Sequence, residues 1–298
     1  MRVANKTIYD STINNLAMTS SAMVDANEIV STTKRINRLS DDPVGLVSVL
    51  NLRSSLSSIG QMERNISIGN SWLTASESAL TQLNDILTAT KELTVGMATA
   101  TVGATERAGN ANLVDGYLEQ IISLANSSSD GRYLFGGTNT GTTPFALNPT
   151  ETAVEYSGND TAFSINIGTD TSIAVGKDGK DIFGENWDDS NIFKTLMDLK
   201  TSLENNEVAG IQDAMSKLDE HMTHVNANIS EIAGKTIRLD VKQEIIADLE
   251  LTYTERKSEL EEADIAEAII NLKSKELAYN AALSSASKLM DMSLVNYI

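Results

Sequence analysis

The fold is decided by residues 211–253, which read IQDAMSKLDEHMTHVNANISEIAGKTIRLDVKQEIIADLELTY. Apolar side chains recur along this segment in alternating steps of three and four residues, and the average step of about 3.5 is typical of helices that pack side by side. A helix with such a stripe cannot cover it alone, so the segment predicts a long helix with a partner helix. The stripe comprises Ile211, Met215, Leu218, Met222, Val225, Ile229, Ile232, Leu239 and Ile246, with polar interruptions at Thr236 and Gln243.

A second stripe with the same spacing lies in residues 49–87 and is the best candidate for the partner helix. Its members are Val49, Leu52, Leu56, Ile59, Ile66, Leu73, Leu80 and Leu87. We expect the first stripe to pack against this second helix within one chain. The residues expected to make the contact are Leu218, Val225, Ile229 and Ile232, and the helix they contact is the one that carries Leu52, Leu56, Ile59 and Leu73.

The sequence Ser40-Asp41-Asp42-Pro43 predicts where that partner helix begins. The side chain of Ser40, Asp41 or Asp42 can accept a hydrogen bond from the free N–H groups of a first helical turn. Pro43 suits this turn because the residue has no N–H group to satisfy. Residues 9–38 are therefore expected to form a separate first helix.

A last helix is expected to begin at residue 265, because Asp264 followed by Glu267 has the form of a capping box. Its stripe is interrupted by Glu276, and the stripe of the first helix is interrupted by Ser20, Asn27 and Lys34. A helix with such an interrupted apolar stripe buries too little apolar surface to offset the entropy cost of ordering its backbone. We therefore expect both terminal helices to become ordered only when neighbouring subunits cover them, through the assembly residues Ile13, Leu16, Met23, Val30, Ile269, Leu272, Tyr279, Leu283, Met290 and Leu294.

The composition changes after Ser127, where helix-forming residues give way to Gly, Thr, Asn and two of the three prolines. Apolar and polar residues then alternate in short runs, separated by turn-rich stretches such as residues 157–160, and this pattern predicts antiparallel strands. Helical spacing resumes near Ile192. Residues 131–190 are therefore expected to form a small β domain at the periphery, with strands around Val154, Tyr156, Phe163, Ile165, Ile167, Ile173 and Val175.

Together these patterns predict a mainly α fold. The N- and C-terminal segments are expected to form a long antiparallel helical bundle or coiled coil, with a small antiparallel β domain inserted between them. Three parts are expected: terminal helices from residues 1–40 with 264–298 as the assembly domain, a central α domain from 41–130 with 191–263, and an outer β domain from 131–190.

The composition excludes several classes of function. The 298 residues include 41 acidic and 23 basic side chains, and the net charge of −18 repels nucleic-acid phosphates and anionic membranes. The absence of cysteine excludes disulfides, thiolate zinc sites and cysteine nucleophiles. No run approaches the about 18 apolar residues that cross a bilayer, and the N-terminus lacks the apolar stretch of a secretory signal. We expect no nucleic-acid partner, no membrane insertion and no Sec signal peptide.

His221 and His224, beside Glu220, form the one metal-like pattern in the sequence. The chain has no third histidine, and both positions flank the Met222 and Val225 seam, so we expect both imidazoles to face solvent. We assign no metal site, and whether these histidines bind any metal is left open. The acidic run from residue 255 to 267 is interpreted as a solvated helix face.

The remaining catalytic patterns are absent. The glycine-rich residues 136–141 lack the spacing and the lysine of a phosphate-binding loop. The sequence has no G-x-S-x-G elbow for a serine nucleophile. We therefore expect no catalytic residues and no cofactor, and we expect that the chain is not an enzyme.

Several segments resemble the bacterial flagellin family. Residues 34–43, KRINRLSDDP, are similar to the family's basic-Ile-Asn stretch and its Ser-Asp-Asp-Pro helix break. Residues 130–138, DGRYLFGGT, followed by Pro144-Phe145, resemble members found at the junction of hook and filament more than filament flagellins. Residues 262–266, EADIA, are similar to the family's Asp-Ala-Asp segment, and residues 292–294 resemble the tail of the junction members. The resemblance covers nearly the whole chain.

Two positions depart from the family pattern. Thr32-Thr33 stands where the family often has a glycine, a residue that adopts positive φ without steric cost, and Glu262 replaces an aspartate. Neither departure affects the overall resemblance.

The resemblance implies a structural role, in which a ring of subunits acts as an adaptor between the flagellar hook and the filament. The implied partners are other copies of the chain, the hook-side junction protein, flagellin and a flagellar export chaperone. The implied location is the extracellular flagellum, reached through the flagellar type III apparatus. A short filament-forming flagellin is the first alternative, and the block from residue 130 to 145 discriminates against it. A cytosolic helical signalling protein is a distant alternative, because it explains neither the β insertion nor the Ser-Asp-Asp-Pro break.

Overall fold

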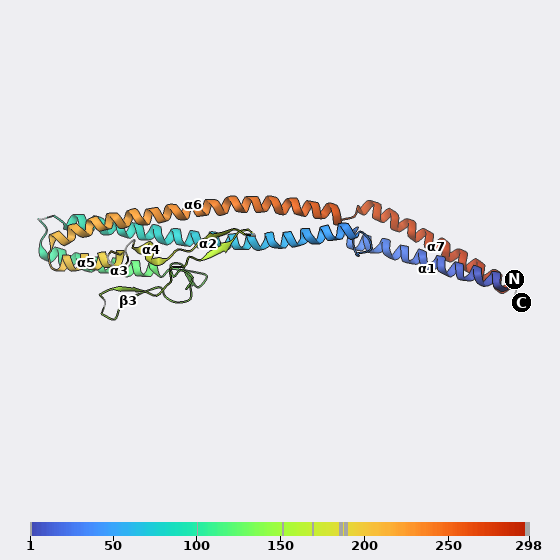
Figure 1. The fold of residues 1–298 in the computed structure, drawn as a ribbon, viewed down its shortest axis with the longest axis horizontal. Helices are drawn as coiled ribbons and strands as arrows, with labels where there is room; N and C mark the ends of the chain where they lie inside the picture. Colours follow the sequence, from blue (N-terminus) through green and yellow to red (C-terminus); the bar gives the residue numbers. More distant parts are fainter. Residues whose placement is uncertain are drawn as a thin grey trace. The chain divides into compact units, whose positions relative to one another are not determined.

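The computed structural model describes residues 2–99, 101–150, 152–168, 170–184, 187 and 190–295, and at residues 2–5, 8 and 289–295 it describes the backbone only. The described chain is mainly helical, with small antiparallel hairpins in the middle, which confirms the predicted fold class (Figure 1). The helices are α1 (Arg2–Thr32), α2 (Pro43–Met97), α3 (Ala104–Ala125), α4 (Gly179–Phe183), α5 (Ile192–Glu204), α6 (Val208–Glu261) and α7 (Ile265–Val295).

The chain divides into two compact units. Unit 1 consists of residues 1–59 and 248–298, and unit 2 consists of residues 60–247. The long helices α2 and α6 contribute residues to both units. The division into three parts that we expect from the sequence stays a prediction.

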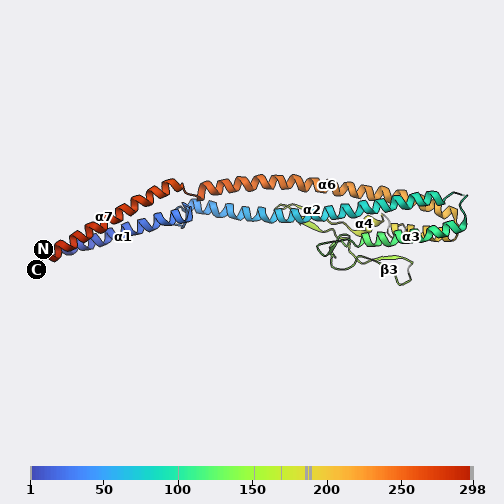
Figure 2. The same cartoon turned by 180° about the vertical axis from the view of Figure 1, so that it is seen from behind.

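In unit 2, α2 and α6 lie side by side and run antiparallel, as both views show (Figures 1 and 2). The Asn70 side-chain amide donates to Asp240 at 3.3 Å, and Lys91 forms an ion pair with Asp219. Leu218 on α6 therefore lies opposite the part of α2 near Lys91, so its stripe faces the predicted partner helix. A regular stripe looks the same after sliding by one repeat, so its spacing identifies the partner helix but not which residues meet.

A layer formed by α3 and α5 covers this helix pair, and the two helices pack against each other. The shared core is apolar and closed to solvent, which stabilises it by about 1.5–3 kcal/mol for each large side chain buried. Its fully buried members include Leu80, Leu83 and Leu87 on α2, Val114 and Ile121 on α3, Leu196 and Leu199 on α5, and Ile211, Leu218 and Val225 on α6.

Buried Arg107, on the first turn of α3, ties the α2–α3 connection to the α5–α6 turn. Its guanidinium donates to the carbonyls of Met97 at 3.0 Å and Thr99 at 2.7 Å, and to the side-chain oxygen of Asn206. Asn206 adopts a positive φ of 59°, a conformation that asparagine tolerates better than most residues. The charge is thus satisfied by neutral oxygens at this end of the helices.

Among its described residues, the β segment forms three separate two-stranded antiparallel sheets. The strand pairs are β1 (Ser128–Ser129) with β2 (Arg132–Tyr133), β3 (Phe145–Leu147) with β4 (Val154–Tyr156), and β5 (Ser164–Asn166) with β6 (Ser172–Ala174). The first hairpin turns at Asp130 and Gly131, both with positive φ, as the tight turns of two-residue hairpins require.

The β segment shares its core with the helices. Phe145 of β3 packs against Phe193 of α5 with a centroid distance of 5.4 Å and against Phe183 of α4 at 5.0 Å. Asn126, at the end of α3, makes two hydrogen bonds with the backbone of Phe145, at 2.8 and 3.0 Å. These contacts anchor the β3–β4 hairpin on the helical layer.

The β5–β6 hairpin packs on α2. Trp72 stacks near Phe163 at 5.1 Å, and a Cβ atom added at Gly69 would lie 2.4 Å from Ile165 Cδ1. A larger residue at position 69 would therefore displace the Ile165 side chain where the hairpin contacts the helix. The alternation in the sequence reveals the strands but not this packing, and an outer position for the whole β domain stays a prediction.

His221 corrects one expectation from the sequence. Its side chain is buried, with an exposed fraction of 6%, and its Nε2 lies 2.9 Å from the hydroxyl of Thr195 on α5. The prediction that it faces solvent is wrong because α5 covers a second face of α6, which the single apolar stripe does not show. Burial lowers the pKa of His221 to about 4.

The buried imidazole predicts a pH dependence of folding. In the unfolded chain His221 becomes protonated below a pH of about 6.5, whereas in the folded chain it stays neutral down to about pH 4. The free energy of unfolding should therefore fall by about 3 kcal/mol as the pH decreases from about 6.5 to about 4. His221→Gln should remove that component when urea unfolding is measured at several pH values. His224→Gln, one turn further along α6 and half-buried, is the matched control. Equal pH slopes for the wild type and His221→Gln would contradict this account.

Candidate assembly interface

In unit 1, the break between α1 and α2 lies beside the break between α6 and α7. We call these two breaks, residues 33–42 and 262–264, the joint. The N–H of Arg35 donates to the carbonyl of Glu261 at 2.7 Å, and the N–H of Ala263 donates to the carbonyl of Thr33 at 3.0 Å. These bonds form a short antiparallel bridge between segments more than two hundred positions apart in sequence.

The side chain of Glu261 is the charged centre of the joint. It is buried, with a residue exposure of 3%, and its Oε1 lies 2.6 Å from both Lys34 Nζ and Arg53 Nη2. Burial opposes ionisation, but hydrogen bonds from Lys34 and Arg53 outweigh it and lower the pKa of the carboxyl. One carboxylate thus links the α6 end, the α1–α2 loop and α2.

The aspartates of both breaks accept backbone hydrogen bonds. Asp41 accepts from the N–H groups of Asn37 at 3.0 Å and Arg38 at 2.8 Å, and these bonds lower the pKa of its carboxyl. Asp42 caps the start of α2 by accepting from the Gly45 N–H at 2.8 Å. Ser40 donates only to Asp41, at 3.4 Å, and Pro43 is the first residue of α2.

Asp264 holds the start of α7 in the same way. Its Oδ1 accepts from the N–H groups of Ala266 at 2.8 Å and Glu267 at 3.2 Å. Two of the four free N–H groups of the first helical turn are thereby satisfied.

Arginines connect the loop to the neighbouring helices. Arg38 pairs with Asp25 at 3.4 Å and with Glu28, both on α1, and Arg35 donates to the Leu260 carbonyl at 3.0 Å. The sequence resemblance identified this basic run but not its partners. The interpretation of residues 255–267 as a solvated helix face is wrong for Glu261, which is buried against Lys34 and Arg53, because no spacing rule connects residues so far apart in the chain.

The terminal helices α1 and α7 lie side by side (Figures 1 and 2). Among the described residues, the side chains that these two helices bury completely are small: Ala26, Ala268 and Ala286. Five predicted assembly residues are half-buried on these helices: Leu16, Met23, Val30, Leu272 and Tyr279. The side chains of Met290 and Leu294 lie outside the described residues.

Other predicted assembly residues are more open to solvent. Ile13, Ile269 and Leu283 are exposed. Further apolar side chains that the stripes did not identify are still more open, with exposed fractions of 71% for Ile270 and 72% for Leu277 on α7, and 71% for Met18 on α1. We call these exposed side chains the outer face of the terminal pair. Large apolar side chains that are this exposed make the terminal pair a candidate interaction surface.

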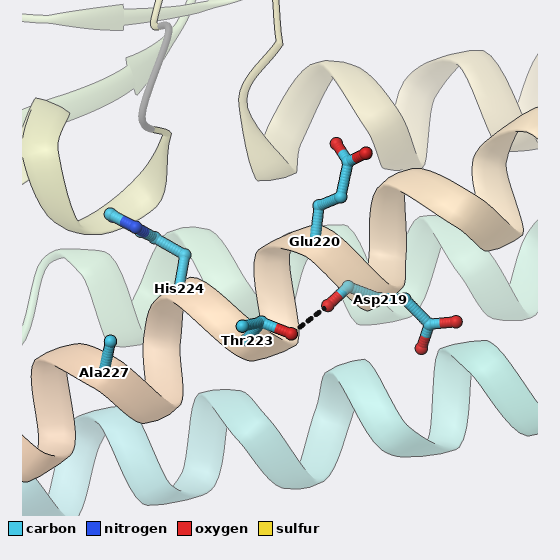
Figure 3. Close-up of a pocket in the computed structure, with 5 residues that line it drawn as sticks. All are labelled: Asp219, Glu220, Thr223, His224 and Ala227. Atoms are coloured by element: carbon cyan, nitrogen blue, oxygen red, sulfur yellow. Dashed lines mark hydrogen bonds between the residues drawn. The ribbon is translucent and has the colours of Figure 1, made fainter.

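A shallow pocket on α6 of about 440 Å³ contains His224 but not His221 (Figure 3). Two of its polar side chains are already engaged: Asp219 pairs with Lys91, and His224 Nε2 contacts the carbonyl of Asp181 on α4. His221 instead points to Thr195 of α5. Within the part of the chain that the structure describes, no group of three or more His, Asp or Glu side chains is placed to hold a metal ion.

None of the described helices is long and apolar enough to cross a membrane.

Comparison with known proteins supplies the context for this geometry. The family described as the bacterial flagellin N-terminal helical region matches residues 3–140. Flagellar hook-associated protein 3 of Salmonella typhimurium is 22% identical over 316 residues, which cover 99% of this chain and 98% of that protein. These findings support the assignment of this chain as a flagellar junction protein. The resemblance to the flagellin family is thereby confirmed.

A flagellin of Bacillus subtilis is also similar, at 23% identity over 97% of this chain and 95% of that protein. The crystal structure of hook-associated protein 3 from Legionella pneumophila shares the fold, with a TM-score of 0.64 and 13% identity over 71% of this chain and 98% of that one. The junction component of hook and filament is favoured over a filament flagellin and over a cytosolic signalling protein. The relatives are structural flagellar proteins.

The joint yields a prediction on stability. Glu261→Gln should lower the free energy of unfolding by about 1–2 kcal/mol, because the glutamine loses two charge-assisted bonds whose cationic partners are themselves about half exposed. Because folding lowers the pKa of Glu261, its contribution should be present above about pH 4.5 and lost as the pH falls below it. Thermal unfolding followed by circular dichroism and calorimetry measures both effects. Glu259→Gln, exposed on the same helix, is the control, and identical melting of the two variants would refute a stabilising role for Glu261.

Proposed function

We propose that this chain is the adaptor that joins the hook to the filament of a bacterial flagellum, with α1 and α7 as its assembly domain. The observation that carries the proposal is the likeness to hook-associated protein 3 over nearly the full length of both chains. The exposed apolar side chains of the outer face support the choice of α1 and α7, because they leave a surface that further subunits can cover.

Assembly would proceed by burial of the outer face. Ile270 and Leu277 lie seven residues apart, two helical turns, and so present their side chains on one side of α7. Covering each of them with a neighbouring subunit would contribute about 1.5–3 kcal/mol. In the part of the chain that the structure describes, the side chains that α1 and α7 bury completely are alanines, and Ile270 and Leu277 stay exposed for partners.

The partners proposed for this surface are other copies of the chain in a ring, the hook-side junction protein on one side and flagellin on the other. A flagellar export chaperone would hold the chain before assembly. The place of action would be the extracellular flagellum, reached unfolded through the flagellar type III apparatus. The function proposed is structural and involves no catalysis.

The proposal predicts the phenotype of a strain that lacks the chain. Electron microscopy should show hooks without filaments, and unpolymerised flagellin should accumulate in the medium. Antibodies against the chain should label wild-type flagella at the hook–filament boundary alone. Intact filaments in the deletion strain would refute the proposal, and labelling along the filament would instead favour a filament flagellin.

The outer face is tested in the same strain by complementation. Ile270→Glu combined with Leu277→Glu should leave the melting of the free chain unchanged, because both side chains are exposed in it, and should fail to restore filaments. Ile270→Leu combined with Leu277→Ile keeps the apolar surface and is the matched control. Filament assembly by the glutamate variant would exclude this face from assembly.

A further inference from the structure

The backbone of the joint contains an unusual conformation at Thr33. Its φ is 60°, and among the described residues the other non-glycine residues with positive φ are Asp130 and Asn206. Aspartate and asparagine visit the left-handed region far more readily than a β-branched residue, for which it is an outlier. Thr33 is thus the strained member of the three.

The strained conformation is coupled to the bridge across the joint. The carbonyl of Thr33 accepts from the Ala263 N–H at 3.0 Å, and two residues later the Arg35 N–H donates to the Glu261 carbonyl at 2.7 Å. Lys34, between them, reaches Glu261 at 2.6 Å. The left-handed turn at Thr33 leads the chain out of α1 and sets residues 34 and 35 against the end of α6. The two bridge hydrogen bonds and the Lys34–Glu261 ion pair therefore depend on the strained conformation of Thr33.

The side chain of Thr33 contributes little stabilisation to offset this strain. Its residue is exposed, and its hydroxyl donates to the carbonyl of the preceding residue, Thr32, at 2.6 Å. No burial of the methyl group offsets the left-handed backbone. The stabilising contributions come instead from the two bridge hydrogen bonds and from the Glu261 ion pairs.

We propose that the joint is a two-state latch whose closed state is weakened by strain at Thr33. In the closed state Thr33 is left-handed and both bridge bonds are formed. In the open state Thr33 relaxes to an ordinary backbone conformation, the two bonds break, and α1 separates from the α6–α7 break. The latch is a property of the free chain, so its test does not depend on the proposed function.

The latch is tested by replacing Thr33 with residues that tolerate positive φ. The Thr33→Asn variant should favour the closed state. The amide hydrogens of Arg35 and Ala263 should then exchange with solvent at least about fivefold more slowly. This factor corresponds to removing the free-energy cost of a left-handed conformation at a β-branched residue. Amide exchange of the isolated monomer, followed by NMR, measures this directly. The amide of Ile121 in the core of unit 2 is the internal reference, because it should not change.

Two further variants separate strain from other effects. Thr33→Val keeps the β-branch and loses only the hydroxyl bond to Thr32, so its exchange should not slow. Thr33→Gly removes the strain completely but makes the open chain more flexible, so its slowing should be smaller than that of Thr33→Asn. Unchanged or faster exchange at Arg35 and Ala263 in both the Asn and the Gly variants would overturn the latch, and so would equal slowing in Thr33→Val.

Discussion

Two helices packed side by side can bury only one face each, and this limit shapes the whole molecule. In unit 2 the pair formed by α2 and α6 is covered by α3 and α5, so Leu83, Ile121 and Leu199 lose all contact with solvent. In unit 1 the pair formed by α1 and α7 has no such covering layer among the described residues, and Ile270 and Leu277 keep more than two-thirds of their surface exposed. The same kind of helix pair therefore forms a fully buried core in unit 2 and leaves apolar surface exposed in unit 1.

The joint compensates for the small apolar core of unit 1. The apolar side chains buried there, among those described, are Ala26, Ile36, Val49, Ile59, Ala268 and Ala286, and several of these are small. Hydrogen bonds to charged groups contribute about 1.5–3 kcal/mol each when they are shielded from water, and less where the cationic partner is about half exposed, as Lys34 and Arg53 are. Glu261 accepts two such bonds, and the aspartate caps satisfy N–H groups at both helix starts. Polar contacts thus define the geometry where burial is scarce.

The sequence predicted those features that arise from local rules. The stripe from Ile211 to Ile246 predicted α6, Pro43 and Asp264 marked helix starts, and the alternation around Ile165 and Ile173 located a hairpin. The register of α2 against α6 was not predictable, because a repeating stripe is unchanged by sliding. The burial of His221 depends on α5, and the charge of Glu261 is met by Lys34 and Arg53, more than two hundred positions away. Contacts of this kind depend on how the helices are arranged in space, and the spacing of residues along one helix does not predict that arrangement.

We infer that unit 2 is complete in the free chain, whereas α1 and α7 require neighbouring subunits. Hydrogen exchange with mass spectrometry, on a verified monomer and on isolated hook–filament junctions, tests it directly. In the monomer we expect strong protection of α3, α5 and the unit 2 part of α6, and rapid exchange in α1 and α7. After assembly we expect a large gain of protection in α1 and α7. Equal protection of both units in the monomer, or no gain in α1 and α7 at the junction, would contradict it.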